Sequence, residues 1–134
     1  VLMHTVKSHG KWSKQNPFEA SVDFDKSKPL AVITRATIKP KLAYQFWKNV
    51  PSVSKSMNNY DELIFSKGIG EFPLLMQATL SLWSTAEAMM NYAYKNPKHA
   101  EMVKKTRELN WYSEELFARF QPFYQEGNLI PRIL

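Results

Sequence analysis

The residue of this sequence best suited to carry chemistry is His99, two positions after Pro97 near the start of an expected helix. Met102, Val103 and Thr106 follow on the same side of that helix, because residues three and four apart are neighbours on a helix surface. A neutral imidazole on such a face is a good axial ligand for porphyrin iron, so His99 is the candidate metal ligand. Spacing alone favours a simpler interpretation, in which His99 is a half-exposed residue of the first helical turn.

Three arginines are candidates for binding an anion. Arg35 and Arg119 lie in segments expected to be strands, and Arg107 lies two turns beyond His99 on the expected helix. A guanidinium in such a segment needs an anionic partner, and its planar donors fit a carboxylate. That partner is either a glutamate of this chain, which makes the contact an internal salt bridge, or a ligand carboxylate such as a haem propionate.

The sequence lacks the residues that several other kinds of functional site require. The 134 residues include no cysteine, which excludes disulfides, cysteine-ligated zinc, iron–sulfur clusters and a thiol nucleophile. There is also no P-loop, no complete dinucleotide-binding glycine motif and no nucleophile elbow. We expect His4, His9 and the adjacent Glu114 and Glu115 to face solvent, and we assign no catalytic residue.

The composition indicates one globular domain with a basic surface. Eighteen Lys and Arg residues against twelve Asp and Glu give a net charge of +6. Such a surface favours anionic partners, namely carboxylates, phosphates, membrane headgroups or nucleic acid. We do not expect nucleic acid, because the aromatic residues do not follow the paired pattern of an RNA-recognition motif. No apolar run approaches the ~20 residues of a membrane-spanning helix.

Aromatic and methionine side chains are numerous enough to line an apolar cavity, although such residues more often form the core. The candidates are Phe46, Trp47, Phe65, Met76, Met89, Met90, Trp111 and Phe117.

Hydrophobic periodicity and helix-boundary signals predict the secondary structure. The expected strands are 1–7, 30–38, 63–69, 74–83 and 115–124, and the expected helices are 40–58, 84–96 and 97–110. Pro40 begins the first helix, which Pro51 breaks or bends. Ser84 is the expected hydroxyl cap of the second helix, and Asn96 the expected cap of the third.

From residue 30 onward, the order of these elements is β–α–β–β–α–β, with the two successive helices 84–96 and 97–110 counted as one helical unit. This is the ferredoxin-like arrangement of the α+β class, in which helices cover one side of an antiparallel sheet. The other face of the sheet needs a partner, and pairing two such sheets into an α/β barrel supplies one. We expect residues 1–29 to be a strand and linker from an upstream half, and residues 30–134 to be the ferredoxin-like domain.

Several motifs, in unbroken order from about Leu30 to Gly127, resemble the spheroidene monooxygenase family. They are Leu30–Ile38, Phe46-Trp47 with Val50-Pro51, Gly68-Ile69-Gly70-Glu71 with Pro73, Gln77–Trp83, and Trp111–Phe120. The resemblance implies a dimeric α/β-barrel fold and a haem-dependent monooxygenase that introduces a keto group into an acyclic carotenoid. It also implies dioxygen, an electron donor and a large apolar substrate.

The same resemblance makes His99 the leading axial ligand. Related haem proteins of this barrel type carry their proximal histidine on the second helix, which corresponds here to the helical unit 84–110, and His99 is the only histidine on any expected helix. Arg35, Arg107 and Arg119 become candidate anchors for haem propionates or substrate. Family members are typically longer, with two ferredoxin-like halves, so we expect a homo-oligomer or pairing with a second half. We expect a cytoplasmic protein, with peripheral membrane contact as a further option. The alternative is a non-catalytic dimeric ligand-binding module of the same fold.

Overall fold

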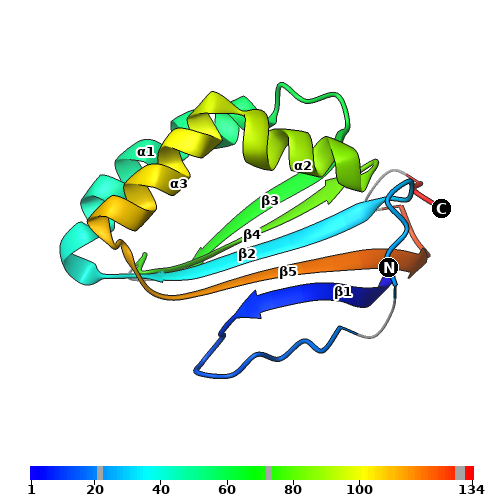
Figure 1. The fold of residues 1–134 in the computed structure, drawn as a ribbon, viewed down its shortest axis with the longest axis horizontal. Helices are drawn as coiled ribbons and strands as arrows, with labels where there is room; N and C mark the ends of the chain where they lie inside the picture. Colours follow the sequence, from blue (N-terminus) through cyan, green and yellow to red (C-terminus); the bar gives the residue numbers. More distant parts are fainter. Residues whose placement is uncertain (21–22, 72–73, 129–131) are drawn as a thin grey trace.

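Five antiparallel strands form one sheet, and the helices lie on a single face of it (Figure 1). The computed structural model describes residues 1–134 except 21–22, 72–73 and 129–131, so Pro73 of the expected turn lies outside the described residues. The strands are β1 (Leu2–Gly10), β2 (Leu30–Ile38), β3 (Leu63–Glu71), β4 (Met76–Trp83) and β5 (Tyr112–Tyr124). The helical segments are η1 (Pro40–Leu42), α1 (Ala43–Met57), α2 (Ala86–Lys95) and α3 (Pro97–Leu109).

The order of the strands confirms the ferredoxin-like fold. The sheet runs β1-β5-β2-β4-β3, and its last four members are the four strands of the predicted β–α–β–β–α–β unit. β1 extends that unit at the edge beside β5 (Figure 1). It reaches Gly10 instead of ending at Lys7, because Ser8, His9 and Gly10 continue the pairing with β5.

Alternation along β2 assigns its side chains to the two faces of the sheet. Leu30 packs under α2 with Trp83, and Ile38 packs under α1 with Phe46. Ala31 faces the other way and packs with Ala118. The helix side therefore holds two separate apolar clusters, one near each end of the sheet.

The helix boundaries follow local hydrogen bonding. α1 continues through Pro51, so this proline does not end the helix. Thr85, not the expected Ser84, caps α2, and its side chain accepts a hydrogen bond from the Ala88 backbone N–H. Asn96 ends α2 and caps α3, as predicted.

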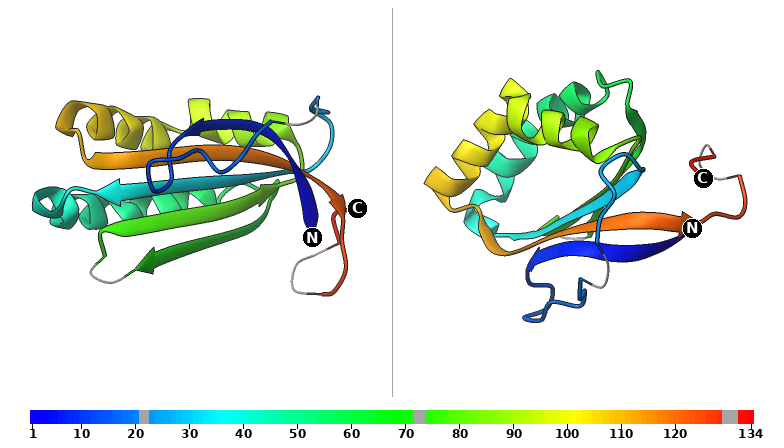
Figure 2. Two further views of the ribbon diagram at one scale, coloured as in Figure 1. Left: turned by 90° about the horizontal axis from the view of Figure 1, so that it is seen from below. Right: turned by 45° about the vertical axis from the view of Figure 1, so that its right-hand side comes forward.

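The sheet face opposite the helices is covered in part by the segment after β1, which crosses β5 and β2 there (Figure 2, left). Phe18 from this segment packs edge-on against Phe120, with ring centroids 4.9 Å apart. Ile69 and Met76 on β3 and β4 are 59% and 37% exposed. The apolar surface of this face is thus only partly covered within the chain.

Candidate functional site

His99 lies at the junction of α2 and α3, and its side chain is half-buried. Its backbone N–H donates to Oδ1 of the cap residue Asn96 at 3.0 Å. Its ring Nδ1 lies 2.9 Å from the carbonyl oxygen of Ala93. Because a carbonyl only accepts, we assign the proton to Nδ1, which leaves the lone pair on Nε2. Metal-binding histidines are oriented in this way, with one ring nitrogen donating to the protein.

The protonation state of His99 also suits a ligand. Burial lowers the pKa of His99 below its ordinary value of 6.5, and the hydrogen bond to Ala93 acts in the opposite direction. The imidazole is therefore neutral at neutral pH, which is the form that binds a metal ion.

Aromatic side chains support the His99 ring. The Tyr92 ring lies 4.8 Å from it, centroid to centroid, and stacks on Trp83 at 5.3 Å. Tyr60 packs edge-on against Tyr92 at 5.4 Å. Burial raises the pKa of Tyr92 to about 12, so its hydroxyl remains protonated. This cluster fixes one side of the imidazole against the core.

Five residues on the helix side of the sheet form what we call the inner sheet surface. They are Thr34, Gly68, Thr79, Phe117 and Arg119. Thr34 and Thr79 are half-buried although they lie on inner strands, and Phe117 is 41% exposed. A Cβ atom built on Gly68 would meet nothing within 4 Å. The helices therefore leave this central part of the sheet accessible, on the same side as His99.

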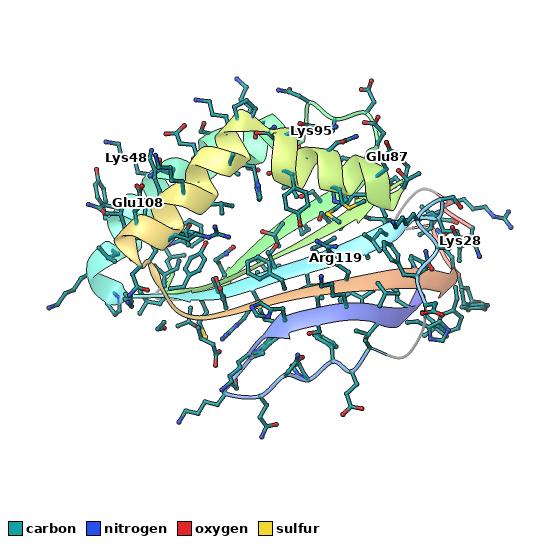
Figure 3. The ribbon with its side chains drawn as sticks, in the orientation of Figure 1. Lys28, Lys48, Glu87, Lys95, Glu108 and Arg119 are labelled. Atoms are coloured by element: carbon teal, nitrogen blue, oxygen red, sulfur yellow. The ribbon has the colours of Figure 1, made fainter. Side chains whose placement is uncertain are left out.

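Arg119 is the one arginine of the three candidates that lies on the inner sheet surface. It is half-buried, and its strand position is opposite Val32, which packs under α2. Figure 3 shows Arg119 on the helix-facing side of β5. Among the residues that the structure describes, Arg119 forms no ion pair. It is available to bind an anionic group on the side of the sheet where His99 lies.

Arg107 does not point in the same direction as His99. It is exposed near the end of α3. Arg107 follows His99 by eight residues, which turns the two side chains about 80° apart around the helix axis. The structure thus places Arg107 on the outer surface.

Arg35 lies on the opposite face of the sheet from His99. Its side chain is 7% exposed, and its guanidinium pairs with the Glu114 carboxylate. Trp12 covers it, with the guanidinium carbon 5.4 Å from the indole centroid. The sequence left two anionic partners open for Arg35, a glutamate of this chain or a ligand carboxylate, and the structure pairs it with the glutamate.

Glu114 was expected to face solvent, but its side chain is partly buried and binds groups of this chain. Besides Arg35, its carboxylate accepts hydrogen bonds from the backbone N–H groups of Ser13 and Lys14, at 3.0 and 2.7 Å. The Lys14 N–H has the largest effect in holding the pKa of Glu114 below its ordinary 4.5. Glu114 thereby ties the loop after β1 to β5. His4 and His9 are exposed, as predicted.

Other features of the described chain do not form a competing site. No group of three or more His, Asp or Glu side chains there is arranged to hold a metal ion. A groove of about 100 Å³ between α1 and α3 contains none of the candidate residues. It is smaller than ordinary ligand pockets, which measure roughly 300–1,000 Å³. Within the same described residues, every helix is too short or too polar to cross a bilayer.

Three curated relatives confirm the resemblance stated from the motifs. Spheroidene monooxygenase of Cereibacter sphaeroides is 37% identical over 122 residues, which are 90% of this chain and 38% of the relative. That of Rhodobacter capsulatus is 35% identical over 128 residues, 94% of this chain and 53% of the relative. That of Rubrivivax gelatinosus is 36% identical over 99 residues, 74% of this chain and 38% of the relative. The chain therefore spans about half or less of each relative.

Solved structures share the fold at low sequence identity. Rv0793 from Mycobacterium tuberculosis superimposes with a TM-score of 0.65 at 11% identity, over 75% of this chain and 100% of that one. An antibiotic biosynthesis monooxygenase gives a TM-score of 0.63 at 9% identity, over 72% and 99%. No protein-family model matches the chain.

Proposed function

Because the chain is related in sequence to the spheroidene monooxygenase family over most of its length, we propose that it is part of a haem-dependent monooxygenase. Its proposed substrate is a large apolar molecule, an acyclic carotenoid, into which a keto group is introduced. The observation that carries this proposal is 35–37% identity over as much as 94% of the chain to proteins that bear that name. Haem is the more specific part of the proposal, and it depends on the geometry of His99.

Four features of the structure support a haem ligand at His99. The ring donates through Nδ1 to Ala93, so Nε2 is unprotonated. Its pKa is lowered by burial. Tyr92 holds the ring from one side. The inner sheet surface is accessible on the same side of the sheet, and its exposed Phe117 suits a flat apolar group. When bound, haem supplies the activation of dioxygen, using electrons from a donor.

The roles of the arginines differ in this proposal. Arg119 is the arginine that would bind a haem propionate, because it lies on the inner sheet surface without an ion pair among the described residues. Arg107 would do so only through its long side chain, from the outer side of α3. Arg35 is already bound by Glu114 on the opposite face, so its role in the chain is structural.

The sheet face opposite the helices is the proposed site of pairing. Ile69 and Met76 are exposed on it, and Phe65 and Leu80 are half-buried. A second ferredoxin-like sheet, from another copy or from the rest of a longer protein, would cover this apolar surface as in an α/β barrel.

Turnover of a carotenoid tests this function. The protein, loaded with haem and supplied with dioxygen and a reductant, is incubated with spheroidene, and the product is identified by mass spectrometry. We expect a product that has gained one oxygen atom and lost two hydrogen atoms, and no such product with His99→Ala. Equal product from the haem-loaded parent and the His99→Ala variant would remove His99 from the proposal.

A further inference from the structure

The outer surface of the helical layer carries nearly all the net charge of the chain. η1, α1 and α3 together contain seven basic residues and two acidic ones, a net charge of +5. The whole chain carries +6. Because α1 and α3 lie side by side on one face of the sheet, the molecule is electrically polarised, with one strongly basic side (Figure 1).

Three lysines form a regular row on this side. Lys48 and Lys55 are seven residues apart on α1, which is two helical turns, so they point in nearly the same direction. Lys41 lies in η1, directly before the start of α1. All three are exposed, and Figure 3 shows Lys48 on the outer side of the helical layer. η1 and α1 contain no Asp or Glu. None of the three lysines forms an ion pair within the part of the chain that the structure describes.

An exposed aromatic side chain lies within this row. Tyr44 is 80% exposed and stands three positions after Lys41 and four before Lys48, so the three residues are neighbours on the helix surface. A tyrosine has an apolar ring and a polar tip, which suits the boundary between lipid headgroups and acyl chains. Exposed lysines attract an anionic membrane surface electrostatically, and a tyrosine between them can contact the headgroup region.

We propose that the row Lys41, Lys48 and Lys55, together with Tyr44, docks the chain on a membrane that contains anionic lipids. Nucleic acid is also anionic and would also complement this basic surface. The choice of a lipid membrane rests on the proposed function, because an apolar carotenoid dissolves in a bilayer. Docking through α1 leaves the opposite face of the sheet free for pairing. The inner sheet surface lies between the docked helix α1 and the sheet face that is free for pairing.

Vesicle binding tests the proposal with a matched control. The variant Lys41→Gln/Lys48→Gln/Lys55→Gln is compared with Lys7→Gln/Lys26→Gln/Lys67→Gln, which removes three exposed lysines from outside the helices. Both variants lose the same net charge, and circular dichroism checks that both are folded. Binding is measured by co-sedimentation with phosphatidylcholine vesicles, with and without phosphatidylserine, and with a single-stranded oligonucleotide as competitor.

The parent chain is expected to bind the phosphatidylserine vesicles and not the neutral ones. Each lysine near an anionic surface contributes about fivefold in affinity, so the helix variant should bind about a hundredfold more weakly. The control variant should bind within a few fold of the parent. Absence of binding by the parent, equal losses in the two variants, or tighter binding to the oligonucleotide would each overturn the proposal. The experiment uses neither haem nor turnover, so its failure leaves the monooxygenase proposal standing.

Discussion

Replacing Asn96 by alanine should weaken the fold and loosen His99 at the same time. Asn96 is 6% exposed, and its side chain caps α3 by accepting a hydrogen bond from the His99 backbone N–H at 3.0 Å. Its Nδ2 also lies 3.4 Å from the Tyr60 hydroxyl. The residue therefore connects the cap of α3 to the aromatic cluster behind the imidazole.

The expected magnitude follows from the cap. Loss of an asparagine cap costs about 1 kcal/mol, with a range of roughly 0.5–2 kcal/mol. His99 is half-buried, so water replaces the lost bond only in part. For a domain of 134 residues, about 1 kcal/mol lowers the melting temperature by roughly 3–5 °C. The His99 pKa should rise toward 6.5, because a looser ring is better solvated.

The assay combines thermal unfolding with a histidine titration by nuclear magnetic resonance. Thr85→Ala is the matched control, since Thr85 caps α2 through the Ala88 N–H at 3.2 Å and lies away from His99. Both variants should lose similar stability, and only Asn96→Ala should change the His99 pKa. Asn96→Ser, which keeps a cap oxygen, should restore most of the stability. An unchanged His99 pKa in Asn96→Ala would refute the coupling between the cap and the imidazole.

Three other substitutions or conditions give further checks. Gly68→Leu should leave the melting temperature unchanged or raise it, because a Cβ there meets nothing within 4 Å, yet it should weaken haem binding; unaltered haem affinity would contradict a ligand on the inner sheet surface. Glu114→Gln should lower the melting temperature at neutral pH. The folded-state pKa of Glu114 is depressed, so the stability that its carboxylate contributes is lost as the pH falls below 4.5. The melting temperatures of the parent and of Glu114→Gln should therefore become equal in acid. A difference in melting temperature that stays constant with pH would contradict this account. Haem affinity should be constant above pH 6.5 and fall once His99 protonates at its lowered pKa; a loss that begins above pH 6.5 would show that His99 is not the group responsible.

Local signals predicted most elements of this fold. The β-branched run between Pro29 and Pro40 gave the bounds of β2, Leu30–Ile38, because proline limits a strand from both sides. The Asn96-Pro97 pair predicted the junction of α2 and α3 for a similar reason. The cap of α2 was misassigned to Ser84, since two adjacent hydroxyl residues satisfy the same pattern and only the backbone dihedral angles distinguish them.

Contacts between residues far apart in the sequence could not be predicted from local sequence patterns. Alternation correctly separated Glu114 from Glu115, but it did not reveal that Glu114 meets Arg35 and the loop at Ser13 and Lys14. That contact depends on the register of β5 against β2 and on where the loop crosses the sheet. The accessible centre of the inner sheet surface was missed for the same reason.

The arrangement of the candidate site residues could be predicted only in part. The family resemblance made His99 the leading candidate, whereas spacing alone favoured a simpler interpretation. Nothing in the sequence indicated the Ala93 carbonyl that orients its ring. The three arginines were treated alike, although the structure divides them between two faces of the sheet and the outer side of α3. The alternation of side chains along a strand shows that Arg35 and Arg119 lie on opposite faces of the sheet only after the pairing register of β2 with β5 is known.

The absorption spectrum of the protein titrated with haem tests the central claim most directly. The parent chain and a His4→Ala/His9→Ala control should give the same Soret band, because both of those histidines are exposed. His99→Ala should shift that band and weaken binding, since it removes the imidazole that supplies Nε2. Identical spectra for the parent and His99→Ala would contradict the claim. A folded parent that binds no haem would instead favour the non-catalytic ligand-binding module.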